Sequence, residues 1–380
     1  MSVVDKKIRV ALMTYAFDGR RAMGTALYAR KLTEKLLTDK RFEFFLVHYE
    51  PSNDPIYKGV NEIIMPRVKL PFGSHFVSQL LFFWQQRKQP FDIVHWFQPR
   101  IYPFFWLAPA RKIVVTTHGA GDITAPGHFV LSRFIFNKTL IWFNSKVNAF
   151  LADSIYGKQE IIDHYRAKSN KTFFTYLGGG EDFMPLNKEQ AWSKVKKYNI
   201  HKPFILEVAR MLPHKNVISV VKAYLSLRAQ LQQEIDLVVV GSDQSEGQKI
   251  KELASNSNYA SDIHFINYVE SEDLNAFYSA ASVFVFPSLQ EGFGLPLIEA
   301  MAAGTPVITS NVTSLPEIVG QAGLVVSPLD IEALSQAMKI VLTDQVLANN
   351  LRELGLKRAQ EFSWSKTALK TADIYLQLCN

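Results

Sequence analysis

The sequence predicts an α/β protein made of two doubly wound domains, each a parallel sheet with helices on both faces. Short apolar runs rich in β-branched residues alternate with stretches of helical periodicity along the 380 residues. This alternation is typical of parallel sheets. It occurs once in each half of the chain, and a polar stretch that begins with three successive glycines, 178–202, separates the halves. We therefore expect a first domain over 1–184 and a second over 185–363, with a boundary and hinge between them.

In the first half, short runs rich in Val, Ile, Phe and Thr are expected to form strands. These runs are Arg9–Tyr15, Phe42–His48, Asp92–Trp96, Lys112–Thr117, Ala149–Asp153 and Thr172–Leu177. The periodicity of Thr25–Leu37 predicts a helix, which follows a loop with Gly19 and Gly24.

The second half repeats this pattern. Strands are expected at Pro203–Ala209, Ile235–Gly241, Asp262–Ile266, Val283–Phe286, Pro306–Thr309 and Gly323–Val326. Helices are expected at Val217–Leu231, Ser271–Ala280, Leu297–Ala303, Ile331–Leu342 and Gln345–Phe362. Ligands of such sheets bind beyond the carboxyl ends of the strands, so site residues are expected just after strands.

Composition excludes several classes of protein. The only cysteine is Cys379, so an intramolecular disulfide is impossible and a cysteine-based zinc site is not expected. No apolar run reaches the length of about 18 residues that a membrane-spanning helix needs, and no signal-peptide pattern follows Met1. These features favour a cytoplasmic protein.

Charge is distributed unevenly along the chain. The net charge is +7, with 25 Lys+Arg and 15 Asp+Glu in residues 1–185 against 17 and 20 in residues 186–380. The first half, at +10, favours an anionic neighbour such as a nucleic acid, an acidic membrane or a phosphorylated substrate. A merely soluble basic surface is the alternative.

Familiar catalytic and binding motifs are missing from the sequence. It contains no G-x-x-x-x-G-K-[ST], no G-x-G-x-x-G after a strand, no H-E-x-x-H, no G-x-S-x-G and no Asp-x-Asp. A P-loop, a dinucleotide fingerprint, a zincin site and a serine-hydrolase elbow are therefore not expected.

One dense region remains, which begins at Phe284 and reads FVFPSLQEGFGLPLIEAMAAG. Here a strand is followed by a glycine-bearing loop and by a helix that opens near Pro296. The backbone amides at this helix start favour a phosphate, and the carboxylates of Glu291 and Glu299 accept hydrogen bonds from hydroxyls. The combination suits a nucleotide sugar. On spacing alone, a capped helix with solvated glutamates is equally consistent. The amides concerned are those of Gly292, Phe293, Gly294 and Leu295.

The two glutamates, separated by seven residues, resemble the donor-site signature of retaining glycosyltransferases of family 4. The downstream segments Gly304-Thr-Pro-Val-Ile and Leu315-Pro-Glu-Ile strengthen the resemblance. That family has the GT-B fold, in which two Rossmann-like domains face a central cleft. The first domain would bind the acceptor and the second the nucleotide-sugar donor, and a C-terminal helix over 364–380 would pack back on the first.

The resemblance also implies roles for individual residues. Arg210 and Lys215, after a strand, would hold the donor diphosphate, which suits a guanidinium and an ammonium. Glu299 would bind the ribose hydroxyls, and Glu291 would contact the transferred sugar near the reacting face. Amides of Phe293 and Gly294 would contact sugar hydroxyls, and that of Leu295 the phosphate.

Two places in the first domain match the family more loosely. His118, in Thr116-Thr-His-Gly, resembles the active-site histidine that contacts the donor sugar. Gly24 and Thr25 resemble the glycine loop under the diphosphate, although the family usually has two adjacent glycines there. The catalytic set implied by the resemblance is thus His118, Arg210, Lys215 and Glu291.

The function implied is a retaining hexosyltransferase that needs no metal or other cofactor and that transfers mannose from GDP-mannose to a glycan or lipid-linked acceptor, as in bacterial polysaccharide or lipopolysaccharide assembly. UDP-glucose and UDP-N-acetylglucosamine stay open as donors. A sugar-nucleotide 2-epimerase and a noncatalytic sugar-nucleotide-binding protein are the alternatives. A nucleic-acid binder has no recognition motif in its support.

Two segments mix aromatic with basic residues, Val68–Lys88 and Phe129–Lys146. They are compatible with peripheral contact with an anionic membrane, which here would be the cytoplasmic face of the inner membrane. Burial in a core or a dimer face explains their composition equally well.

Overall fold

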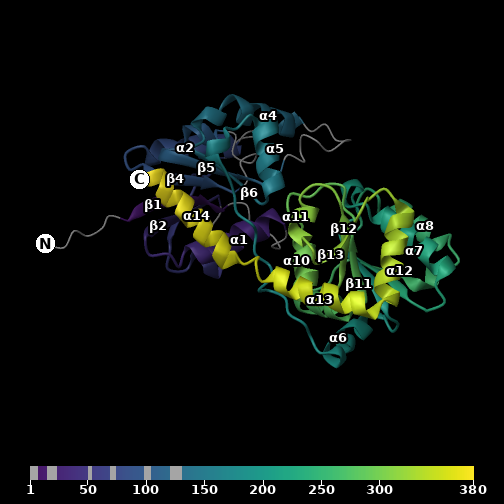
Figure 1. Ribbon diagram of the computed structural model, residues 1–380. Helices are drawn as coiled ribbons and strands as arrows, with labels where there is room; N and C mark the ends of the chain where they lie inside the picture. The colour runs from purple at the N-terminus through teal and green to yellow at the C-terminus, as the bar shows by residue number, and fades with distance from the viewer. Residues whose placement is uncertain (1–6, 15–23, 50–53, 69–73, 98–103, 120–130) are drawn as a thin grey trace. The chain divides into compact units, whose positions relative to one another are not determined.

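The computed structural model describes residues 7–14, 24–49, 54–68, 74–97, 104–119 and 131–380. The chain divides into two compact units, which Figure 1 colours along the sequence. Unit 1 consists of Met1–Leu177 with Trp364–Asn380, and unit 2 of Gly178–Ser363. The division thus falls a few residues before the expected boundary at 184, and the C-terminal segment belongs to unit 1. The three glycines belong to unit 2, where the amide of Gly180 donates to the carbonyl of Phe362 at 3.2 Å.

Unit 1 contains a parallel sheet whose strand order is β3-β2-β1-β4-β5-β6-β7. The order reverses between β1 and β4, which are hydrogen-bonded neighbours. Loops that follow these strands leave the same edge of the sheet, where doubly wound folds place their ligands. The strands are β1 (Ile8–Met13), β2 (Phe42–His48), β3 (Asn61–Ile64), β4 (Phe91–Trp96), β5 (Ala110–Thr117), β6 (Ala149–Ala152) and β7 (Thr172–Phe174).

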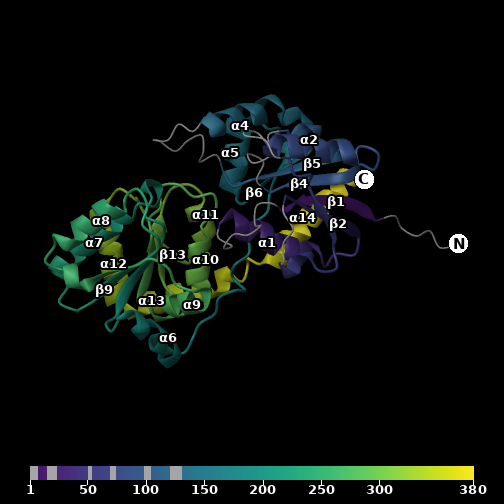
Figure 2. The same cartoon turned by 180° about the vertical axis from the view of Figure 1, so that it is seen from behind.

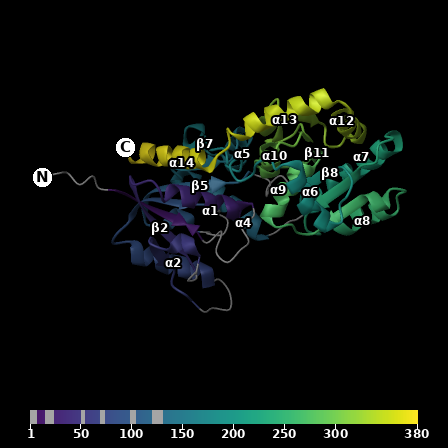
Figure 3. The ribbon, with the colours of Figure 1, turned by 90° about the horizontal axis from the view of Figure 1, so that it is seen from below.

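Helices cover both faces of this sheet because alternate strand residues are buried on each side. On one face, side chains of α2 (Ser74–Gln86), α4 (Leu131–Trp142) and α5 (Ile155–Tyr165) share an apolar core with the strands. On the other face lie α1 (Thr25–Leu36) and α14 (Trp364–Cys379). Figure 3 shows α14 and α2 on opposite sides of the sheet.

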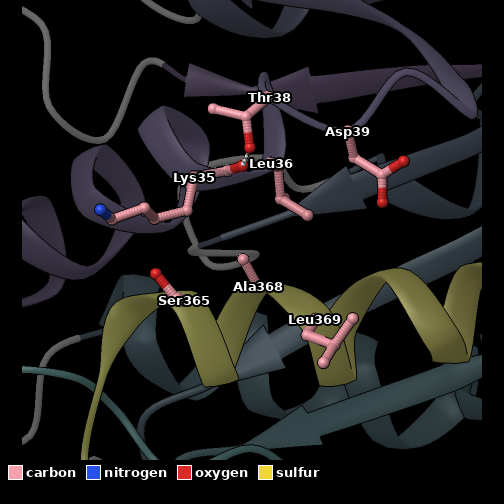
Figure 4. Close-up of a pocket in the computed structure, with 7 residues that line it drawn as sticks. All are labelled: Lys35, Leu36, Thr38, Asp39, Ser365, Ala368 and Leu369. Atoms are coloured by element: carbon pink, nitrogen blue, oxygen red, sulfur yellow. Dashed lines mark hydrogen bonds between the residues drawn. The ribbon is translucent and has the colours of Figure 1, made fainter.

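The helix α14 therefore completes unit 1, although it follows the whole of unit 2 in the chain. It contacts α1, and the Thr367 hydroxyl donates to the Tyr176 carbonyl at 2.6 Å. A hollow of about 150 Å³ lies between the end of α1 and α14. Its lining residues, shown in Figure 4, are Lys35, Leu36, Thr38, Asp39, Ser365, Ala368 and Leu369.

Unit 2 contains a second parallel sheet, with the strand order β10-β9-β8-β11-β12-β13. Its order reverses between β8 and β11, which pair directly. The strands are β8 (Phe204–Val208), β9 (Asp236–Val240), β10 (Ile263–Ile266), β11 (Val283–Phe286), β12 (Val307–Ser310) and β13 (Gly323–Val326).

The helices of unit 2 form two groups, as right-handed crossovers on either side of the β8/β11 reversal require. In one group α7 contacts α8 and α12, which Figure 2 shows together. In the other, α9 contacts α6 and α10, and α10 contacts α13. The helices are α6 (Lys188–Val195), α7 (Val217–Gln230), α8 (Gly247–Ser255), α9 (Ser271–Ala280), α10 (Leu295–Ala302), α11 (Leu315–Val319), α12 (Ile331–Thr343) and α13 (Gln345–Ala359).

The predicted architecture of two doubly wound parallel-sheet domains is confirmed. Elements without a range predicted from sequence include β3, α5, α6, α8 and α11. The strand β3 reads NEII and lies at the exposed edge of its sheet, so it lacks the apolar run of a buried strand. Tyr15 and Gly19, named in the sequence prediction, lie outside the described residues.

Candidate functional site

The predicted donor residues of unit 2 come together at the reversal of its strand order. Arg210 and Lys215 follow β8, and Glu291 follows β11. Because β8 and β11 are parallel neighbours, both loops leave the same edge of the sheet. The two loops are joined by a hydrogen bond from the Leu289 amide to the His214 carbonyl at 2.7 Å. Residues 76 apart in sequence therefore share one site.

Lys215 and Glu291 form an ion pair, with 2.5 Å between Nζ and Oε1. Their side chains are only 17% and 13% exposed, so water screens the pair weakly. The ammonium also lies 5.4 Å from the ring centroid of Phe286. Arg210, by contrast, is exposed. The Lys215 ammonium is thus held at the carboxyl edge of the sheet. An anionic group of a ligand can compete with Glu291 for this ammonium.

The loop from Glu291 to Leu295 leads directly into α10. The Ser314 hydroxyl lies within hydrogen-bond distance of the carbonyls of Glu291 and Phe293, at 3.1 and 3.0 Å. Gly294 has φ +108°, and a Cβ there would approach Leu315 Cδ2 to 2.7 Å, so glycine is required. These contacts fix the loop directly before the first turn of α10. The free backbone amides of that turn favour an anion.

Glu299 lies inside α10, one of its carboxylate oxygens accepting a hydrogen bond from the Tyr278 hydroxyl at 2.8 Å. Burial raises the pKa of Glu299 to about 7, and the nearby charge of Asp182 adds to this, while the Tyr278 hydrogen bond opposes it. Tyr278 was not predicted from sequence, because no pattern links a helix tyrosine to a glutamate 21 residues later.

Beneath this site lies Glu207, on β8 and fully buried. Neither of its carboxyl oxygens has a hydrogen-bond partner within the described residues. Burial raises the pKa of Glu207 well above its ordinary value; Lys215 opposes this rise and Glu291 adds to it. A neutral carboxyl is therefore favoured under the Lys215–Glu291 pair.

The predicted residues of unit 1 also lie near one another. His118 follows β5, and Gly24 precedes α1 as its N-cap, with φ +56°. Tyr28, on the first turn of α1, meets the His118 ring edge-on at 5.0 Å between centroids. Thr25 is half-buried at the helix start. Gly24, Thr25 and His118 thus belong to the same unit, and the other predicted residues to unit 2.

Both ring nitrogens of His118 have partners. Nδ1 lies 2.8 Å from Asp153 Oδ2, and Nε2 lies 3.1 Å from the Phe97 carbonyl. Asp153 is nearly buried, and its other oxygen has no hydrogen-bond partner among the described residues. Its role was not predicted, although its place at the carboxyl end of β6, beside β5, was a usable signal.

Both halves of the chain match known protein families. Residues 188–358 match the family described as "Glycosyl transferases group 1", and residues 23–178 match "Glycosyltransferase Family 4". O-antigen chain mannosyltransferase B of Escherichia coli is 32% identical over 276 residues, which cover 72% of each chain. The serotype-specific mannosyltransferase WbdA of Escherichia coli is 34% identical over 237 residues, 61% of this chain but only 29% of that longer protein.

Solved structures share the fold. Sucrose-phosphate synthase of Thermosynechococcus elongatus superposes with a TM-score of 0.76 at 24% identity, covering 98% of this chain and 99% of that one. Anabaena Alr3699/HepE, in complex with UDP-glucose, gives 0.77 at 14% identity, with 97% and 100% covered. The fold is therefore GT-B. With the two family matches and the relatives above, the chain belongs to the family 4 glycosyltransferases.

Proposed function

We propose that the chain transfers mannose from GDP-mannose to a hydroxyl of a glycan or lipid-linked acceptor, with retention of anomeric configuration and without a metal ion. The observation that carries the proposal is the Lys215–Glu291 pair at the carboxyl ends of β8 and β11. It holds a poorly exposed cation beside the start of α10, and both the cation and the helix start favour a diphosphate.

The charges of the site match those that develop during transfer. As the bond from sugar C1 to the diphosphate oxygen breaks, the sugar gains positive charge and the diphosphate negative charge. Lys215, Arg210 and the amides at the start of α10 stabilise the leaving group, and no cation beyond these is needed. The acceptor oxygen bonds to C1 on the same face, and its proton passes to the departing phosphate oxygen. Glu291 contacts the sugar hydroxyls and Glu299 those of the ribose, while the resemblance assigns His118 to the donor sugar.

The choice of mannose rests on the relatives. O-antigen chain mannosyltransferase B, WbdA and, at 27% identity, O-antigen chain mannosyltransferase RfbU of Salmonella typhimurium all carry that activity in their names. UDP-sugars remain the alternative donors, since Anabaena HepE has the same fold and is solved with UDP-glucose.

Calorimetric titration with GDP, UDP, GDP-mannose and UDP-glucose, with and without EDTA, tests the donor. We expect binding of GDP and GDP-mannose only, unchanged by EDTA. Preference for UDP would overturn the mannosyl assignment, and loss of binding with EDTA would overturn the metal-free mechanism. NMR of the product made from GDP-mannose, whose mannose is α-linked, should show an α-linkage; a β-linked product would contradict retention.

We also propose that α2 contacts an anionic membrane. Phe76, Leu80 and Trp84, four residues apart and so on one side of the helix, are 45%, 39% and 61% exposed. The Arg87 guanidinium lies 4.0 Å from the Trp84 ring centroid, which combines charge with an apolar surface. Of the two aromatic and basic segments predicted from the sequence, Val68–Lys88 has residues 69–73 outside the described residues, and Phe129–Lys146 has residues 129 and 130 outside them. No helix in the described part of the chain has the length and hydropathy to span a membrane.

Sedimentation with lipid vesicles tests this contact. We expect the protein to bind vesicles containing anionic phospholipid, and Leu80→Ser with Trp84→Ser to weaken binding at least about tenfold, because burying each side chain is worth about 1.5–3 kcal/mol. Leu329→Ser with Val346→Ser, at positions of unit 2 that are 72% and 81% exposed, is the control for loss of exposed apolar surface and should bind normally. Equal loss in both double variants, or equal binding to neutral vesicles, would contradict the proposal.

A further inference from the structure

A line of hydrogen-bonded polar side chains crosses the interior of unit 1. The Tyr375 hydroxyl, on α14, lies 2.5 Å from His95 Nδ1, on β4. His95 Nε2 lies 2.7 Å from the Thr116 hydroxyl, on β5, which lies 3.0 Å from the Tyr28 hydroxyl, on α1. All four side chains are at most 1% exposed. Four elements far apart in sequence are therefore linked by three consecutive hydrogen bonds.

The bonds of this line depend on one another. Burial lowers the pKa of His95 to about 3, with the charge of His118 contributing, so His95 is neutral. A neutral imidazole donates through one nitrogen and accepts at the other, so its two bonds must run in one direction. If the Tyr375 hydroxyl is removed, one ring nitrogen of His95 loses its partner in a fully buried position, and the rest of the line must reorganise.

The line ends against His118. The Tyr28 ring packs edge-on against the His118 ring at 5.0 Å, and Phe97 touches both Tyr28 and His95, at 5.9 and 4.6 Å between centroids. Among the described residues, His118 also contacts the Asp153 carboxylate and the Phe97 carbonyl. The orientation of His118 is thus set on one side by Asp153 and on the other by the end of the line.

We propose that Tyr375 is a positioning residue for sugar transfer, acting from the C-terminal helix through His95, Thr116 and Tyr28 on the orientation of His118. The inference rests on the proposed function, since it takes His118 to contact the donor sugar. It gives α14 a part in the reaction in addition to its packing in unit 1.

Tyr375→Phe tests the proposal because it removes a hydroxyl and keeps the ring. We expect kcat to fall about ten- to a hundredfold, the range of a small misplacement in a site, with little change in the Kd of the donor nucleotide, which binds unit 2. The matched control is Tyr224→Phe in unit 2, whose equally buried hydroxyl donates to the Ile235 carbonyl at 2.8 Å. It should lower thermal stability comparably and leave kcat unchanged.

Two further measurements make the test decisive. Thr116→Val breaks the line at its middle. The double variant Thr116→Val with Tyr375→Phe should therefore have a kcat only slightly below that of the slower single variant.

In ¹⁵N-histidine NMR spectra, the His118 signals, assigned by their loss in His118→Gln, should shift in Tyr375→Phe and not in Tyr224→Phe. The spectra need no turnover, so they distinguish failure of this inference from failure of the proposed function. Unshifted His118 signals, or an unchanged kcat with lowered stability, would overturn it.

Discussion

Lys215→Ala is expected to lower kcat/KM for sugar transfer about 10²–10³-fold, the usual effect of removing one electrostatic group that stabilises a leaving group. The ammonium is held 2.5 Å from Glu291 at the end of β8, and its side chain is only 17% exposed. A charge so poorly screened by water interacts strongly with a diphosphate. Steady-state kinetics with the donor established by calorimetry would measure the loss.

Controls separate this effect from unfolding. Lys222→Ala removes an exposed lysine of α7 in the same unit and should leave kcat/KM unchanged. Lys215→Ala leaves the poorly exposed Glu291 carboxylate without its cation, so its melting temperature should fall. Adding Glu291→Gln should recover stability without recovering transfer. A near-normal kcat/KM in folded Lys215→Ala would refute the assignment of Lys215.

Glu299→Gln is expected to weaken nucleotide binding about ten- to a hundredfold, since a hydrogen bond to a charged group contributes about 1.5–3 kcal/mol. The folded-state pKa of Glu299, about 7, lies above its ordinary value of 4.5. In the proposed role, Glu299 accepts hydrogen bonds from the ribose hydroxyls as a carboxylate, so binding should strengthen as pH rises through about 7 and should release a proton. Calorimetry between pH 5.5 and 8.5, in buffers of different ionisation enthalpy, measures both.

The same shift affects stability with a defined sign. The folded protein holds the Glu299 proton more tightly than the unfolded chain, so this contribution to the free energy of unfolding is complete below about pH 4.5 and is lost as pH rises to about 7.

Tyr278→Phe, which removes the hydrogen bond that lowers the pKa of Glu299, should move the inflection of nucleotide binding to higher pH. Glu353→Gln, at an exposed position of α13, should behave as wild type. A pH-independent Kd in wild type would contradict the role given to Glu299.

Strands and helices with a strong local pattern were predictable. The runs Phe42–His48 and Val283–Phe286 match their strands, because a buried parallel strand requires a continuous apolar run. The helix α8 was missed because it opens with Gly247 and is largely polar. Glu207 lies inside a predicted strand, yet its charge gave no sign of complete burial; only packing against the neighbouring strands reveals it.

Site residues were predictable where they directly follow a strand, and not where they depend on tertiary packing. Ligands of parallel sheets bind beyond the carboxyl ends of the strands, and this rule, together with the family resemblance, led to His118, Lys215 and Glu291. The partners of Glu299 and His95, by contrast, come from elsewhere in the fold: Tyr278 reaches Glu299 from α9, and Tyr375 reaches His95 across 280 residues. Such pairs follow from the tertiary structure and leave no local pattern in the sequence.

The return of α14 to unit 1 has a consequence for synthesis of the chain. Domains commonly fold as they emerge from the ribosome, starting from the N-terminal end. Unit 1 is translated first, but its His95 acquires a partner for Nδ1 only when Tyr375 has been made, after all of unit 2. Unit 2, a continuous segment, can therefore complete its fold earlier than the unit that precedes it.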